Sequence, residues 1–304
     1  MIRRVLAVTA LVVALTACSP SGSPAATGPT PAPDALRVVA TTTVLADMVK
    51  QVGGANVDVS SIVPKGAVVE TFDPSPQDVA TLSEADLVVI NGLGLDAWLE
   101  PVILSAAPDV RVVRLAELLP GVEYVTGEEE GEAVNPHLWL DVGYAKLYAQ
   151  RITDALAAAD PDQAAAFRAG GDANEARLAA LDAWVREQIA TIPPQNRKLV
   201  SFHEAFPYFA KAYGLEIVGS VVGVPGQDPS AGEVAALVDA IRASGAKAVF
   251  TEAQFNPELA EAIAEEAGVV VESDLYNDSL GDPPVDTYEG LIRWDVERIV
   301  AALR

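Results

Sequence analysis

The chain has 304 residues, of which 50% are hydrophobic and 21% are charged, and this is enough apolar sequence for the cores of about two domains. Its formal net charge of −23 at pH 7 argues against a nucleic-acid partner, because an acidic surface repels phosphates. The sequence has a single cysteine, so we expect neither a disulfide framework within the chain nor a cysteine-rich metal site.

The first 17 residues have the pattern of a secretory signal peptide. Two arginines precede an apolar run over residues 5–15, which is too short to span a membrane as a helix. The run ends in Leu15-Thr16-Ala17-Cys18, which resembles the bacterial lipobox. We therefore expect lipidation of Cys18, with residues 18–36 forming the lipidated end and a flexible tether. The alternative is an ordinary signal peptide with an incidental cysteine.

Residues 37–159 alternate between short apolar runs and helical patterns. Strands are expected at 37–42, 57–63, 86–90 and 111–115, and helices at 44–52, 76–85 and 142–159. Strands that alternate with helices indicate βαβ units and a mostly parallel sheet. We predict an N-terminal α/β domain over this range.

A long helix is expected at residues 160–194. Asp160-Pro161 suits a helix start, apolar residues recur every three or four positions, and Pro193-Pro194 ends the pattern. Gly170-Gly171 is a weak point within it. A second α/β domain follows at 195–304, with strands expected at 198–202, 216–224, 248–251 and 269–271. The predicted fold is thus two α/β domains, each a parallel sheet flanked by helices, joined by one long helix as in a clamp.

The chain has two histidines, and each lies where a ligand site is expected. His137 is in the first domain, and His203 directly follows the strand predicted at 198–202. Ligands bind at the carboxyl ends of parallel strands, where Glu252 and Asp274 also fall. One histidine from each domain could face the other across a cleft, so all four residues are candidate metal ligands. A hydrogen-bonded structural histidine is the alternative in each case.

Several segments resemble, in order and at the right spacing, the motifs of the zinc- and manganese-binding solute receptors of ABC importers. They are residues 71–78, 135–141, 202–209, 225–231 and 250–252. The resemblance covers residues 37–304 and implies an extracytoplasmic lipoprotein, anchored to the cell membrane, that captures a divalent metal between two domains. It also implies delivery to an ABC-type membrane permease. We expect a monomer that is not an enzyme.

Carried onto this sequence, the family's ligands would be the residue at position 70, His137, His203 and Asp274. The family usually has histidine at the first of these positions, where this chain has Glu70. A carboxylate can ligate zinc, manganese or iron, so we expect Glu70 to be a ligand. The alternative is a solvated loop acid beside a three-ligand site. Glu252 is kept as an alternative ligand.

Two imidazoles with two carboxylates leave the metal open, with a slight preference for zinc over manganese. Ligating imidazoles must be neutral, so the affinity should fall below about pH 6.5. The acidic stretch 127–132 is interpreted as a solvated loop, with metal capture as the alternative. Two alternative functions stay open: a secreted metal-dependent enzyme, and a receptor or adhesin for a non-metal ligand. Neither a helix-borne H-E-x-x-H nor a nucleophile motif supports the enzyme, and Trp98, Trp139 and Trp184 fit core packing better than a solute pocket.

Overall fold

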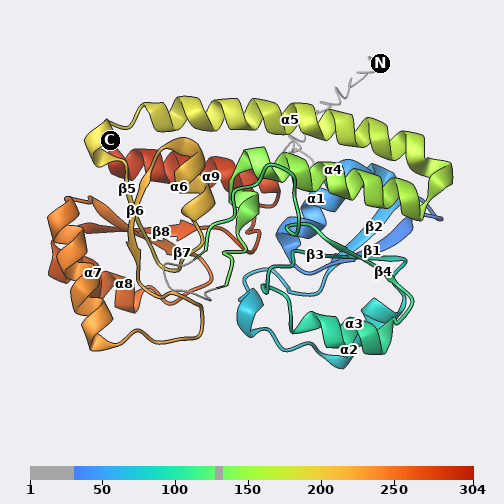
Figure 1. Cartoon of the computed structure of the whole chain (residues 1–304), viewed down its shortest axis with the longest axis horizontal. Coiled ribbons are helices and arrows are strands. Elements are labelled where there is room, and N and C mark those ends of the chain that lie inside the picture. Colours follow the sequence, from blue (N-terminus) through green and yellow to red (C-terminus); the bar gives the residue numbers. More distant parts are fainter. Residues whose placement is uncertain (1–30, 127–132) are drawn as a thin grey trace, which may run out of the picture. The chain divides into compact units, whose positions relative to one another are not determined.

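A computed structural model describes residues 31–126 and 133–304. The signal peptide, the lipidated Cys18, most of the tether and the acidic loop at 127–132 therefore lie outside the described residues. Residues Pro31–Arg304 form one compact unit that contains two four-stranded sheets (Figure 1). Within the described part of the chain, no helix is long and apolar enough to cross a membrane.

The N-terminal sheet has the strand order β2-β1-β3-β4, and every pair in it is parallel. The sequence alternates between sheet faces, as a period of two requires: Val38 and Val89 pack on one side, whereas Val39 and Val88 pack on the other. Its strands are β1 (Leu36–Ala40), β2 (Val57–Ser61), β3 (Leu87–Ile90) and β4 (Arg111–Arg114), and its helices are α1 (Thr43–Gly53), α2 (Pro76–Ser83) and α3 (Leu99–Ala106).

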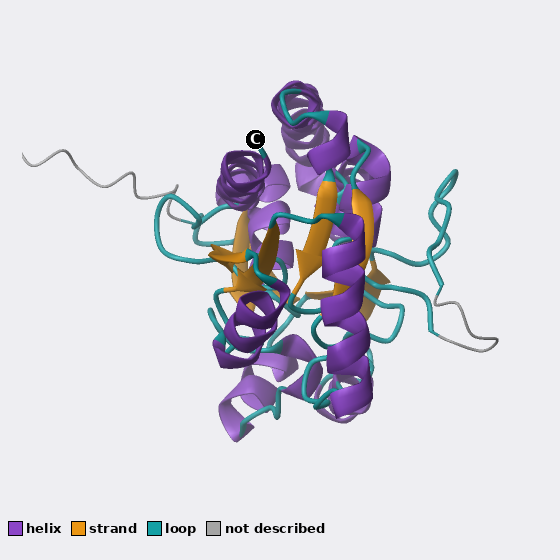
Figure 2. Ribbon diagram, turned by 90° about the vertical axis from the view of Figure 1, so that its left-hand side faces the viewer, coloured by secondary structure: helices purple, strands orange, loops and turns teal. Residues whose placement is uncertain are grey.

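The C-terminal sheet repeats this order as β6-β5-β7-β8, again with parallel pairs. Its strands are β5 (Lys198–Ser201), β6 (Glu216–Ser220), β7 (Ala248–Glu252) and β8 (Val270–Leu275). Its helices are α6 (Pro207–Tyr213), α7 (Ala231–Ser244), α8 (Glu258–Ala267) and α9 (Tyr288–Leu303). The predicted α/β fold class, with two parallel sheets and helices on both faces, is confirmed (Figure 2).

The predicted long helix is α5 (Ala164–Ala190), which follows α4 (Val142–Ala159) and runs along the same side of both sheets (Figure 1). The glycine pair lies inside α5 and does not interrupt it. A Cβ on Gly170 would overlap the backbone carbonyl of Val52 at the end of α1, and one on Gly171 would overlap Thr153 of α4. The pair therefore allows close packing of three helices rather than a break. Short 3-10 helices occur at Gly54–Asn56 (η1), Val69–Thr71 (η2), Leu138–Leu140 (η3), Pro161–Gln163 (η4) and Pro194–Asn196 (η5).

One hydrophobic core is shared by the two sheets. It contains side chains from β1 and β3, from α1, α4, α5 and α9, and from β5 and β7, whereas the outer face of each sheet has a separate smaller core. Trp139 is buried in the shared core, and Trp98 and Trp184 pack against it, in agreement with their predicted role.

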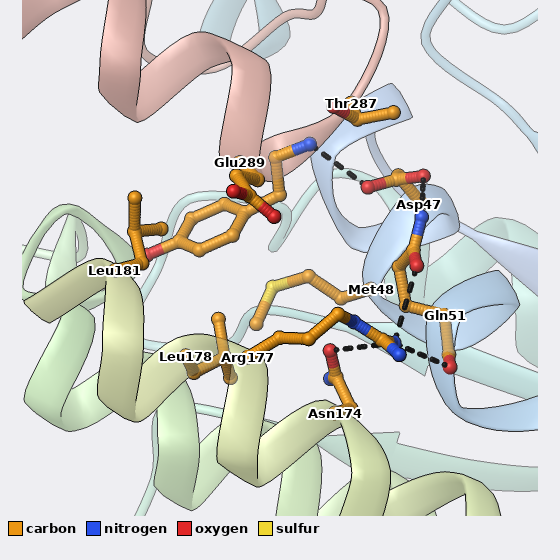
Figure 3. A pocket seen from close by; sticks show the side chains of 10 residues that line it. Asp47, Met48, Gln51, Asn174, Arg177, Leu178, Leu181, Thr287 and Glu289 are labelled. Carbon is orange, nitrogen blue, oxygen red and sulfur yellow. Dashed lines mark hydrogen bonds between the residues drawn. The ribbon is translucent and has the colours of Figure 1, made fainter.

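The junction of α1, α5 and α9 lies within this shared layer (Figure 3). Its helices surround a cavity of about 140 Å³, where Arg177 of α5 donates hydrogen bonds to Gln51 of α1 and to Asn174 of its own helix. The Asp47 carboxylate accepts a hydrogen bond of 2.8 Å from the backbone of Tyr288, at the start of α9. Helix α9 is thereby bonded to α1.

Candidate metal centre

The loop after β2 places Glu70 in the short helix η2. Trp98 donates its indole N–H to the Val69 carbonyl at 3.0 Å, and the Val69 side chain is buried, so the turn is held from both sides. Glu70 is half-buried, and its Oε2 has no hydrogen-bond partner among the residues that the structure describes. A buried carboxylate oxygen of this kind is available to a cation.

The loop after β4 carries His137 directly before η3. The preceding residue, Pro136, accepts a hydrogen bond from Asn91 at the end of β3. Asn135 Oδ1 lies 3.1 Å from the backbone nitrogen and 3.1 Å from Nδ1 of His137. The ring is thus oriented with its Nε2 away from Asn135.

His203 comes two residues after β5, where the Ser201 hydroxyl donates to the His203 carbonyl at 2.7 Å. Its Nδ1 lies 3.5 Å from Oε2 of Glu252, the last residue of β7. The ring also makes an edge contact with Phe255. These contacts leave Nε2 of His203 to face His137.

The fourth residue, Asp278, lies in the loop between β8 and α9. Its neighbours bind this loop to the N-terminal half of the chain. Trp139 donates to the Asn277 carbonyl at 2.9 Å, Leu280 donates its N–H to the Thr43 hydroxyl at 2.8 Å, and Gly66 donates to the Ser279 hydroxyl at 2.8 Å. Asp278 therefore follows a C-terminal strand but is held by N-terminal residues.

These four residues converge on one point. One ligand atom from each of Glu70, His137, His203 and Asp278 lies within 4.8 Å of the others. The two Nε2 atoms are 3.3 Å apart, and Asp278 Oδ1 is 3.4 Å from Nε2 of His137. In the described part of the chain, neither Asp278 oxygen has a hydrogen-bond partner. Two imidazole nitrogens and two carboxylates suit a divalent transition metal.

The pKa values of the two histidines in the cluster are shifted in opposite directions. Burial lowers the pKa of His137, which favours its neutral ring, although Asp278 acts in the opposite direction. Burial opposes the charge on His203 as well, but nearby carboxylates, Glu252 foremost, outweigh it and raise the pKa of His203 to about 9. Burial and the Asp278 charge raise the pKa of Glu70 to about 7. Burial opposes ionisation of Asp278, but its contact with His137 lowers its pKa. Without metal, the cluster therefore retains protons that a metal would displace.

The prediction of Asp274 needs correction, because the structure brings Asp278 into the cluster in its place. Asp274 is exposed, and its backbone carbonyl accepts a hydrogen bond from Trp294. The strand was expected to end at residue 271, where polar residues begin. β8 is an edge strand with an exposed side, so it continues to Leu275 and its carboxyl end lies further along the chain.

Glu252 lies at the strand end that the sequence indicated, but it is behind His203 rather than in the four-residue group. Burial raises its pKa, an effect that the neighbouring His203 opposes. A carboxylate in this position orients a ligating imidazole and raises its basicity. In this geometry Glu252 supports the candidate ligand His203. It does not take the place of a ligand itself, which was the alternative considered from the sequence.

A cavity of about 390 Å³ extends from the cluster. Glu70, His137 and His203 are among the residues that line it, together with apolar residues such as Leu93 and Val224. An ion could reach the cluster by this route.

Two supporting residues were not identified from the sequence. Asn135 and Asn277 both contact a cluster histidine, at 3.1 Å from His137 Nδ1 and 3.4 Å from His203 Nδ1. Asn135 precedes His137 by two positions, and asparagine commonly bonds the backbone at that distance, so a local signal was present. The contact of Asn277 depends on the tertiary fold.

Comparison with known proteins assigns the family. The family model described as the zinc-uptake complex component A, periplasmic, matches residues 38–302. The chain belongs to this family. Members of the zinc-uptake component A family are components of uptake systems and not enzymes. The expected family is therefore confirmed, and so is the expectation that the protein is not an enzyme.

Relatives of the zinc-uptake component A family align over most of the chain. The manganese-binding lipoprotein MntA of Bacillus subtilis is 31% identical over 276 residues, which cover 88% of this chain and 90% of that protein. The iron ABC transporter substrate-binding lipoprotein MtsA of Streptococcus pyogenes is 28% identical over 303 residues. The alignment covers 95% of this chain and 94% of that protein.

Solved structures give the same fold. The periplasmic zinc binding protein TroA of Treponema pallidum superposes with a TM-score of 0.82 at 28% identity, over 88% of this chain and 99% of that chain. A periplasmic metal binding protein of Candidatus Liberibacter asiaticus superposes with a TM-score of 0.81 at 21% identity, over 88% of this chain and 100% of its own.

Proposed function

We propose that the protein captures a divalent transition metal between its two sheets and delivers it to an ABC-type importer. The observation that carries the proposal is the convergence of four lone-pair donors from Glu70, His137, His203 and Asp278 within 4.8 Å. Leaving such groups buried without a cation or proton is costly. The relatives named as binding proteins for manganese, iron and zinc support the same class of ligand.

The metal that we propose is zinc, with manganese as the comparison ion. A four-residue set of two nitrogens and two oxygens suits the tetrahedral coordination that zinc prefers. Manganese favours oxygen-rich, six-coordinate sites. The Glu70 carboxylate in place of a third imidazole moves the donor set toward manganese, which is why both ions belong in the test.

Capture involves both halves of the chain. His203 follows a strand of the C-terminal sheet, whereas Glu70 and His137 lie in loops of the N-terminal sheet. A metal that binds all of them makes its full set of contacts only when the halves are close, so it favours the closed arrangement by its difference in affinity.

We further propose that the protein acts as a monomer outside the cytoplasm, with Cys18 lipidated and residues 18–36 as its tether. The domains would be the N-terminal one at 37–159, the connecting helix at 160–194 and the C-terminal one at 195–304. The relatives named as lipoproteins of ABC importers support this placement and the permease as partner.

Thermal unfolding tests the function. The chain without its signal peptide, stripped of metal, is titrated separately with Zn²⁺ and Mn²⁺. At 100 times the dissociation constant, binding adds about 2.7 kcal/mol, which corresponds to about 4–5 °C for a chain of this size. The shift should disappear in His137→Ala, provided that this variant folds without metal. A folded wild-type protein with no shift for either ion would refute metal capture and favour a non-metal ligand.

A further inference from the structure

Asn135 contacts both halves of the candidate metal centre through one carboxamide. Its Oδ1 lies 3.1 Å from the backbone nitrogen and from Nδ1 of His137. Its Nδ2 donates a hydrogen bond of 2.7 Å to the carbonyl of Glu204, the residue after His203. One side chain thus joins the loops that carry the two candidate histidine ligands.

The orientation of this carboxamide is fixed by its partners. The backbone N–H of His137 can only donate, and the Glu204 carbonyl can only accept. If the amide of Asn135 were rotated by half a turn, its NH₂ group would face the N–H of His137, donor against donor. Its oxygen would face the Glu204 carbonyl, acceptor against acceptor. The carbonyl oxygen must therefore face His137.

The orientation of Asn135 determines in turn which nitrogen of His137 carries the hydrogen. An oxygen acceptor 3.1 Å from Nδ1 favours the tautomer with its hydrogen on Nδ1. The Asp278 carboxylate competes for that hydrogen from the other side of the ring, but its oxygen is farther away, 3.4 Å from Nε2. Nε2 then keeps its lone pair, and it is Nε2 that faces the cluster, 3.3 Å from His203 Nε2. This is the form in which an imidazole binds metal through Nε2.

The main chain of Asn135 forms a second bond to the C-terminal half of the chain. Its carbonyl accepts from the Tyr208 hydroxyl of α6 at 2.9 Å, and the same hydroxyl accepts from the backbone of Val125 at 3.0 Å. Asn135 is therefore attached to the C-terminal half at two points, and the side-chain bond to Glu204 forms only when that loop is near.

We propose that Asn135 is a positioning residue for metal capture: it holds His137 in the metal-binding tautomer and links that state to closure of the Glu204 loop. The proposal rests on the proposed function, since it assigns the role through a ligand of that site. It predicts that His137 has a fixed tautomer and ring orientation when Asn135 is bonded to Glu204. Without that bond, the ring has more freedom.

The two histidines of the chain permit a direct test. Protein labelled with ¹⁵N-histidine gives signals from two imidazoles, and ¹H–¹⁵N correlation spectra distinguish a protonated ring nitrogen from a bare one. Spectra of metal-free wild type, Asn135→Ala, Asn135→Asp and Tyr208→Phe are compared, and zinc affinity is measured by competition with a chelator. Asn196→Ala is the matched control, because it removes an amide-to-carbonyl bond to Leu303 at the far end of the fold.

The expected results separate the two roles of the side chain. Asn135→Ala should give a mixture of His137 tautomers and bind zinc about 10- to 100-fold more weakly, the usual cost of losing a partner of a ligating histidine. Asn135→Asp keeps an acceptor for Nδ1 and should keep the tautomer. Tyr208→Phe removes the bonds of this hydroxyl to the backbone of Asn135 and of Val125, leaves the Asn135 carboxamide intact, and should keep the tautomer too.

A single Nδ1–H tautomer in Asn135→Ala, with zinc affinity equal to that of Asn196→Ala, would overturn the proposal. If Asn135→Ala does not fold, the comparison of Asn135→Asp with Tyr208→Phe still decides it, because loss of the tautomer in Asn135→Asp contradicts the role of the acceptor. If wild type binds no zinc, metal capture fails, whereas the metal-free spectra still report on Asn135.

Discussion

Replacing Asp278 by asparagine tests the composition of the site most sharply. The change keeps the shape of the side chain but removes its charge and turns one oxygen into an NH₂ donor. In the structure the two oxygens lie 3.4 Å from His137 Nε2 and 3.8 Å from His203 Nε2. The amide would therefore direct a donor and no charge at the position of the ion.

The expected loss is large because the carboxylate is buried. Removing one partner of a buried charge pair costs about 3–5 kcal/mol. Since each 1.4 kcal/mol is a factor of about ten, the zinc dissociation constant of Asp278→Asn should rise by roughly 100-fold to several thousand-fold.

Asp274→Asn is the matched control, because it removes the same charge four residues away. Asp274 is exposed, so at physiological salt its effect on the ion is screened and should stay within about threefold. Both dissociation constants are measured by competition with a chromophoric chelator, after metal-free unfolding curves have shown that the variants fold. Equal losses in the two variants, or an unchanged affinity in Asp278→Asn, would refute the geometry described above.

Two further predictions concern packing and pH. Gly170→Ala should lower the free energy of unfolding by about 1 kcal/mol or more, because overlap with α1 outweighs the gain in helix propensity. Gly232→Ala is the control, since its Cβ would meet nothing closer than 3.8 Å, and it should raise the free energy of unfolding by about 0.5–1 kcal/mol. Chemical denaturation checks the opposite signs, and a loss in both would contradict the packing argument. For pH, the metal must displace protons held by His203 (pKa about 9) and Glu70 (pKa about 7), so zinc affinity should rise about tenfold per pH unit between pH 7 and 8.5 and more steeply below pH 7. An affinity that levels off above pH 6.5, as ordinary histidines would give, would show that these protons are absent.

The strands and the long helix could be predicted because their signals are local. Val38, Val39, Val88 and Val89 alternate between two packed faces, and the apolar spacing in α5 continues across Gly170. The role of the glycine pair could not be predicted, because it depends on which helices lie against α5.

The site was predictable where a ligand follows a buried strand and less so elsewhere. His203 comes two residues after the apolar strand β5, whereas Asp278 follows an edge strand whose polar residues give no clear signal of where it ends. Glu70 was located through a motif and not by its own pattern. The bond from Asn135 to Glu204 spans 69 residues of sequence, and no local pattern encodes such a contact.

The core shared by the two sheets determines how the protein unfolds. α9 is the last element of the chain, yet it packs on α5 and α1, and Asp47 of α1 bonds its first turn. Loss of α9 would uncover apolar side chains of α1, α5 and β8, which belong to both halves of the chain, so neither half has a free energy of unfolding that is independent of the other. Denaturation should therefore show one cooperative transition, and a fragment that ends at residue 194 should not behave as an autonomous folding unit.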